Sequence, residues 1–280
     1  MSLRARVHEA NDVQATVGPS PSIWADCPEV DLRMPTQNMG VFIHEDWRKM
    51  PLIPLNTATA EIGGYLVFSN NGAACIGSHI GTALTTITKG YVTPYTIGAG
   101  NTQNFETCMQ WNAGGGVFEI DEHMGKLWFE AAISVDVIAI STAAYFLGLG
   151  AVGSVVTDAI VDLGATMLAA GSFIGFFADT AAVTAFDAMY KTAAVVQTTQ
   201  SAGTASVALA VEKLGFTFDP ETNAVQYFRN GAKIGAAVDI DTAGFPENIV
   251  MSPFFDVKAC DAGPTTANLA IKWWQAAQLY

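Results

Sequence analysis

Two groups of residues in this chain combine acidic side chains in a way that could do chemistry. Asp121-Glu122-His123 offers carboxylates and an imidazole for metal binding or general acid–base work, although a solvated turn before Gly125 accounts for the same residues. Glu130 and Asp136 share one face of an alternating segment with Ser134. As strand residues they would lie roughly 20 Å apart, whereas the carboxylate pair of a glycosidase needs about 5–9.5 Å. The sequence therefore favours a protein that is not an enzyme.

The glycine-rich and acidic loops carry no complete signature of a nucleotide or metal site. Gly114-Gly115-Gly116 lacks the Lys-Ser/Thr that follows a phosphate-binding loop. The run G-L-G-A-V-G from Gly148 resembles a dinucleotide fingerprint only in spacing, since no acidic residue ends a second parallel strand. Asp239, Asp241 and Asp261 could bind calcium, but no D-x-D-x-D-G loop is present. We expect no cofactor and assign no metal site.

Adjacent tryptophans near the C-terminus point to opposite faces of one expected strand. We expect Trp273 in the core and treat Trp274 as an interaction candidate, either a contact between subunits or a platform for a sugar ring. The four cysteines are scattered and include no C-x-x-C pair, so we interpret them as buried thiols rather than zinc ligands or a disulfide framework. They are Cys27, Cys75, Cys108 and Cys260.

Composition narrows the class of protein further. The 280 residues are 50% hydrophobic and 14% charged, which suits one large β-domain or two small ones. A net charge of −13 argues against binding nucleic acid, which requires clustered cations. The N-terminus has no apolar segment typical of a secretory signal. Val137–Val156 has no charge, but Asp136 and Asp158 flank it without nearby Lys or Arg, so two buried strands explain it better than a membrane helix.

Alternating polarity predicts about a dozen short strands from Thr57 onward. Leu214, Phe216 and Phe218 share one strand face, and Asn230-Gly231 predicts a tight hairpin turn between Val225–Arg229 and a following strand. Thr157–Ala170 reads as a short helix or an excursion loop. The other expected strands are 65–69, 74–76, 84–88, 105–111, 117–120, 126–140, 143–149, 172–178, 188–192, 195–199, 233–237 and 268–275.

These elements predict an all-β fold, an antiparallel two-sheet jelly-roll sandwich formed by residues 57–280. Its expected core includes Phe129, Ile133, Leu214, Phe216 and Trp273.

Residues 1–56 differ from the rest, and we call them the N-terminal arm. The arm holds six of the eleven prolines and five of the thirteen cations, with aromatics at Trp24, Phe42 and Trp47. Its prolines exclude a core of its own. We therefore expect an extended arm whose three aromatics are interaction candidates, docked on its own domain or on a neighbouring subunit.

Several segments resemble, in order, a family of tailed-phage virion proteins with a concanavalin A-like jelly-roll domain, described as structural, head-fibre or capsid-decorating. They are K-L-W-F-E-A-A-I-S-V (126–135), Y-F-L-G-L-G (145–150), F-I-G-F (173–176), K-L-G-F-T-F-D-P (213–220), F-R-N-G (228–231) and I-K-W-W-Q-A-A-Q-L (271–279).

The resemblance implies a non-enzymatic virion component on the capsid exterior, assembled in the host cytoplasm. It also implies an oligomer that uses no cofactor and binds the major capsid protein or other virion proteins as a cement. The alternative is a lectin-like module on the virion surface that binds host or other glycans. We expect neither nucleic acid nor membrane as a partner.

Overall fold

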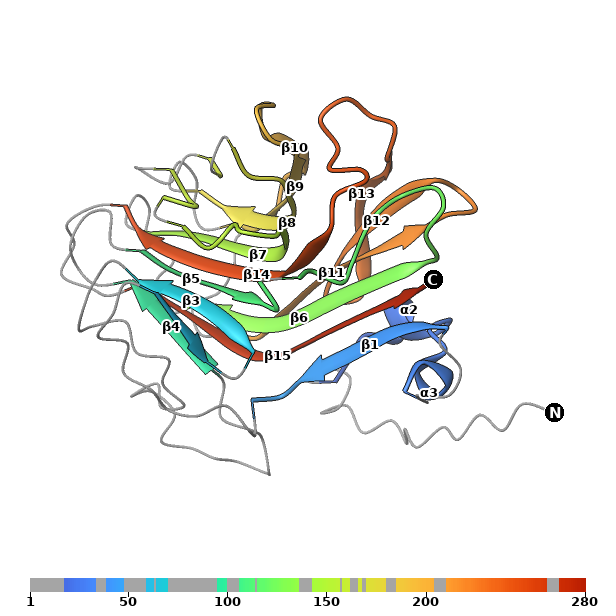
Figure 1. Ribbon diagram of the computed structural model, residues 1–280, viewed down its shortest axis with the longest axis horizontal. Coiled ribbons are helices and arrows are strands. Elements are labelled where there is room, and N and C mark those ends of the chain that lie inside the picture. The colour runs from blue at the N-terminus through green and yellow to red at the C-terminus, as the bar shows by residue number, and fades with distance from the viewer. Residues whose placement is uncertain are drawn as a thin grey trace.

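The chain folds into two antiparallel sheets stacked face to face (Figure 1). The computed structural model describes residues 18–33, 39–47, 59–62, 64–69, 95–99, 106–113, 115–135, 143–156, 158–161, 166–167, 170–179, 185–203, 210–260 and 267–280. This confirms the expected all-β sandwich. The expected strands 74–76 and 84–88 lie outside the described residues.

One sheet has seven strands. Its order is β1 (Gly40–Glu45), β15 (Ala267–Leu279), β6 (Leu127–Val135), β11 (Glu212–Asp219), β12 (Ala224–Arg229) and β13 (Ala232–Asp239), and β4 (Tyr95–Ala99) also pairs with β15. The long strand β15 therefore pairs with β6 along one edge and with both β1 and β4 along the other.

The other sheet has eight strands. Its order is β10 (Thr198–Ser201), β9 (Asp187–Lys191), β8 (Phe173–Ala178), β7 (Ala143–Ala151), β14 (Met251–Ala259), β5 (Glu106–Trp111), β3 (Tyr65–Ser69) and β2 (Thr59–Ile62). Strands far apart in sequence lie next to each other, as β14 does between β7 and β5.

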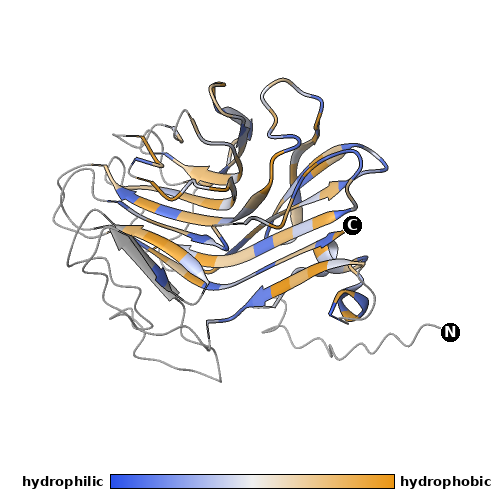
Figure 2. Cartoon of the chain, in the orientation of Figure 1, coloured by the Kyte–Doolittle hydropathy of each residue, from blue (hydrophilic) through white to orange (hydrophobic). Residues whose placement is uncertain are grey.

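The main core lies between the sheets and is built from alternate residues of their strands. Leu214, Phe216 and Phe218 are fully buried there, as are Phe129 and Ile133. The Phe129 and Phe216 rings stack with centroids 5.2 Å apart. Figure 2 shows hydrophobic residues along the central strands of both sheets. The expected inward face of these strands is thus confirmed.

The hairpin between β12 and β13 has the turn that its sequence predicts. Asn230 and Gly231 have φ values of 51° and 78°, so both lie in the left-handed region. Such φ values belong to the tight turn whose twist matches the flanking strands.

The adjacent tryptophans correct the sequence interpretation. Trp274 is fully buried in the main core, whereas Trp273 lies on the outer face of the sheet at 8% exposure. The pairing of β15 with β6 shifts between Ile271 and Trp273, so Lys272 is an extra residue in β15. A bulge of one residue reverses the face of every later side chain, and simple alternation cannot reveal it.

The segment after β7 spans residues 152–172, and we call it the cover segment. Its described residues lie over the outer face of the eight-stranded sheet. Its described residues Val155, Ala159, Ile160 and Met167 are buried against outward side chains of that sheet. Ile160 and Met167 form an isolated β-bridge, and the described residues of the segment contain no helix. Of the two alternatives expected for Thr157–Ala170, the excursion loop therefore fits these residues.

The described part of the arm packs on the seven-stranded sheet of its own chain. It contains the single-turn helices α2 (Pro21–Trp24) and α3 (Glu29–Leu32) and ends with β1, which extends that sheet (Figure 1). Ile23, Trp24 and Leu32 pack on the outward side chains Trp128 and Phe228, in a small cluster separate from the main core.

Candidate functional site

An open hollow of about 540 Å³ lies on the outer face of the seven-stranded sheet, beside α2. Because Phe216, Phe218 and Tyr227 point into the core, their strand neighbours point outward. Outward residues of β11, β12 and β13 and residues of the arm therefore line the hollow. They include Thr217, Asp219, Gln226, Phe228, Lys233, Ser22 and Asp26.

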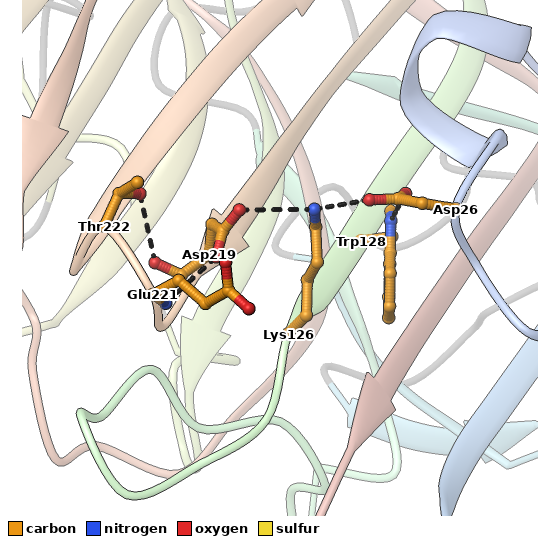
Figure 3. A network of polar contacts seen from close by, with 6 residues as sticks. All are labelled: Asp26, Lys126, Trp128, Asp219, Glu221 and Thr222. Atoms are coloured by element: carbon orange, nitrogen blue, oxygen red, sulfur yellow. Dashed lines mark hydrogen bonds and ion pairs between the residues drawn. The ribbon is translucent and has the colours of Figure 1, made fainter.

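A network of charged and polar side chains crosses the hollow (Figure 3). Lys126 Nζ lies 2.5 Å from Asp26 Oδ2 and 3.4 Å from Asp219 Oδ2, so one ammonium group joins the arm to the end of β11. Trp128 Nε1 donates to Asp26 Oδ1 at 2.9 Å. The side chains of Asp26 and Asp219 are 56% and 35% exposed, which leaves their carboxylates accessible to a ligand.

The electrostatics of the network keep its groups charged. Burial by itself would raise the pKa of Asp26, but the hydrogen bonds from Lys126 and Trp128 outweigh it and lower that pKa. Burial would likewise lower the pKa of Lys126, and the adjacent Asp26 and Asp219 carboxylates raise it instead. The hollow therefore presents an ammonium group between two carboxylates at neutral pH.

Glu130 lies beneath the arm rather than in an open cleft. Its carboxylate Oε2 accepts hydrogen bonds from Trp24 Nε1 at 2.8 Å and from the Ser20 backbone N–H at 2.9 Å. It is fully buried, and burial raises its pKa. With the arm docked, no substrate reaches this carboxylate. Asp136, the other carboxylate considered from the sequence, lies outside the described residues.

The four interaction candidates all pack within this chain. Trp24 is 7% exposed and meets Phe42 edge-on at 6.2 Å. Trp47 is 1% exposed and packs against Tyr65 in the main core. Trp274 Nε1 donates to the Tyr65 hydroxyl at 2.7 Å. Phe42, which is partly buried, is thus the most accessible of the four. The prediction that Trp274 forms a surface contact is wrong, because the bulge turns its side chain into the core.

The other candidates form turns. Asp121–His123 is a turn in which Asp121 Oδ1 accepts the His123 N–H, and both Glu122 and His123 are exposed, as the solvated-turn alternative requires. Asp239 makes the same kind of contact with the Asp241 N–H.

Among the described cysteines, Cys27 is half-buried and Cys108 and Cys260 are buried. Gly114, Cys75 and Asp261 lie outside the described residues.

No group of three or more potential metal ligands occurs among the residues that the structure describes. None of the described helices has the length and apolar character needed to cross a bilayer.

Nothing in the sequence pattern singles out the residues that form the hollow. Asp26 and Lys126 are 100 positions apart, and Lys126 and Asp219 are 93 apart. Asp219 directly follows Phe218, the last of the three residues expected to share one strand face. Their meeting depends on the strand order, so knowledge of the sheet would have been needed to find it.

No family model and no curated protein matches the chain. Among solved structures, a protein of unknown function from Shewanella oneidensis MR-1 matches with a TM-score of 0.53 at 10% identity, covering 90% of this chain and 91% of that one. This likeness shows the fold alone, a sandwich of two antiparallel sheets.

Two lectin-type structures match with lower scores. The carbohydrate recognition domain of Emp47p has a TM-score of 0.49 at 8% identity, covering 83% of this chain and 98% of that one. Peanut lectin has a TM-score of 0.47 at 14% identity, covering 82% of this chain and 99% of that one. The alginate lyase AlyC3 scores 0.46 at 11% identity, covering 66% of this chain and 75% of that one. These likenesses concern the fold.

Proposed function

We propose that this protein is a lectin-like module that binds glycans in the hollow beside α2. The observation that carries the proposal is the open hollow itself, which is lined by accessible carboxylates, an ammonium group and the nearly buried Phe228. Ligand sites commonly combine a concave apolar surface with a few convergent polar groups.

The chemistry of a sugar suits these groups. Each hydroxyl of a glycan both donates and accepts hydrogen bonds. Asp219 and Asp26 can accept, while Lys126 and Lys233 can donate. Hydrogen bonds to charged groups are about twice as strong as those between neutral groups, so a few of them can orient a small ligand. Binding without turnover is the activity that this arrangement supports.

A glycan array followed by calorimetry on the best binder tests the proposal. Asp219→Asn should weaken binding about tenfold, or about 1.4 kcal/mol, because it removes a charged acceptor. The matched control is Asp239→Asn. Asp239 accepts the N–H two residues later just as Asp219 does, at 3.0 Å in both turns, but does not line the hollow. Absence of saturable binding to any glycan, or equal loss in both variants, would contradict the proposal.

A capsid-associated structural role is our second proposal. It is supported by the ordered resemblance of residues 126–135 and 271–279 to phage virion proteins, and these residues fall on β6 and β15 at the centre of one sheet. A cement protein would bind capsids whatever sugar is present, through a surface buried between capsomers. Imaging virions of the phage that encodes it, with and without the protein, tests this role. Virions that lack the protein altogether would exclude it.

A further inference from the structure

A buried polar cluster lies on the outer face of the eight-stranded sheet, under the cover segment and away from the hollow. Lys258 of β14 and Glu106 of β5 are directly opposite in the strand pairing, and both are fully buried. Asp256 is also fully buried, two residues before Lys258 on the same strand face. Asp158 of the cover segment approaches them from above.

The cluster holds the Lys258 amine against the Asp158 carboxyl group. Lys258 Nζ lies 2.6 Å from Asp158 Oδ1 and 2.7 Å from the carbonyl oxygen of Ile160. Glu106 fixes the same part of the cover segment, because Oε2 accepts the Asp158 N–H at 2.6 Å and Oε1 accepts the Ile160 N–H at 2.8 Å. Asp158 has a φ of 61°, a conformation that non-glycine residues adopt at a cost.

The carboxyl groups of Glu106 and Asp256 form a pair that can both accept and donate a proton. The Asp256 carboxyl group is fully buried and lies against that of Glu106. Burial and this mutual repulsion raise the pKa of Asp256, and burial raises the pKa of Glu106. Two adjacent buried carboxyl groups cannot both ionise, so the pair shares one proton.

We propose that Lys258 Nζ and Asp158 Cγ become joined by an intramolecular amide bond. The Lys258 ammonium is fully buried, and a proton passes from it to the Asp158 carboxylate, which neutralises both groups. The amine lone pair then attacks Cγ as the Glu106–Asp256 pair accepts a proton from Nζ. The pair returns that proton to the Asp158 hydroxyl as the C–O bond breaks. One water leaves, the pair ends as it began, and no oxidant or co-reactant is needed.

The geometry brings the reacting groups together and gives the released water a way out. Contact between amine and carboxyl replaces a bimolecular encounter, so the entropy cost of bringing the two groups together is already met in the folded chain. The Asp158 side chain is 45% exposed while that of Lys258 is 0% exposed, so the departing water has a route to solvent although the amine does not. The bond would fasten the cover segment to β14 across 100 positions of sequence and, like a disulfide, would restrict the unfolded chain.

Intact-mass spectrometry of the denatured full chain tests the proposal. The wild-type protein should be lighter than its sequence mass by one water, and a protease digest should contain a branched peptide joining Lys258 to Asp158. Lys258→Met and Asp158→Ala should each restore the full sequence mass. Glu106→Gln should accumulate the uncrosslinked form, because it removes the proton acceptor.

The matched control is Lys191→Met, which removes another buried lysine from the same sheet face. Lys191 Nζ donates to the carbonyl oxygen of Gly171, and this variant should keep the mass deficit. Wild-type protein at its full sequence mass would overturn the proposal. So would a deficit that persists in Lys258→Met, because the lost water would then come from another reaction, such as cyclisation of an aspartate onto the backbone.

Discussion

Gly231 serves two elements at once. Its φ of 78° closes the β12–β13 turn, and its carbonyl oxygen accepts a hydrogen bond from Ser22 Oγ of the arm at 2.6 Å. A Cβ atom at this position would lie 2.9 Å from Ser22 Oγ and 3.2 Å from Ser20 Cβ. The turn therefore needs glycine for its conformation, and the arm needs glycine for its close approach.

Gly231→Ala should reduce stability more than Gly153→Ala. Both positions have a φ near 80°, so both variants lose about 1–2 kcal/mol to backbone strain. A Cβ at Gly153 meets nothing within 4 Å, whereas at Gly231 it displaces the arm. Urea denaturation should show the strain in both, and faster hydrogen exchange at Ile23 and Trp24 should appear only in Gly231→Ala. Equal exchange in the two variants would mean that the arm does not depend on this contact.

Residue patterns predicted this turn because an Asn-Gly pair by itself favours the positive φ angles of a two-residue hairpin turn. They also predicted Leu214, Phe216 and Phe218 as core, since a regular strand alternates. They failed at Trp273 and Trp274, where the extra residue Lys272 shifts the register. The position of a bulge depends on how a strand pairs with its partner, so it cannot be predicted from the sequence of β15 alone.

At the scale of elements, residues 18–33 of the arm form a small packing unit beside the main core. They place α2 and α3 over the outward residues Trp128 and Phe228, and β1 further along the arm pairs with β15. A unit with so few buried contacts should open locally more often than the main core does. Its docking was left open by the sequence, because proline placement shows what the arm cannot form and not where it lies.

Trp24→Phe should loosen the arm while leaving the sandwich folded. The change keeps an aromatic ring but removes the indole N–H that donates to the buried Glu130 carboxylate. An unsatisfied buried acceptor costs about 1–3 kcal/mol. Hydrogen exchange should rise at the backbone amides of residues 23–25 and stay unchanged in β6 and β11. Unchanged exchange throughout would show that the Ser20 N–H alone holds Glu130.

At the scale of the whole molecule, carboxyl groups whose pKa values shift in opposite directions determine how stability depends on pH. Burial raises the pKa of Glu106, Asp256 and Glu130, whereas Lys126 and Trp128 hold the pKa of Asp26 low. The full sequence has a net charge of −13. The composition shows the excess of acidic residues, but only the fold shows which of their carboxyl groups are buried.

These groups predict maximum stability under mildly acidic conditions. A carboxyl group whose pKa is raised by folding stabilises the protein fully below its ordinary pKa, and that contribution is lost as pH rises through the raised value. Asp26 has a lowered pKa, so its contribution is lost instead when the pH falls below its ordinary range. The free energy of unfolding should therefore decline as the pH rises above the ordinary carboxyl range, by up to about 1.4 kcal/mol per pH unit for each proton released. Asp256→Asn should flatten this decline, because an amide does not ionise, while the exposed Asp239→Asn should follow the wild-type curve. Urea unfolding across this pH range measures both variants, and a wild-type stability that increases toward alkaline pH would show that the buried carboxyl groups are already ionised in the folded protein.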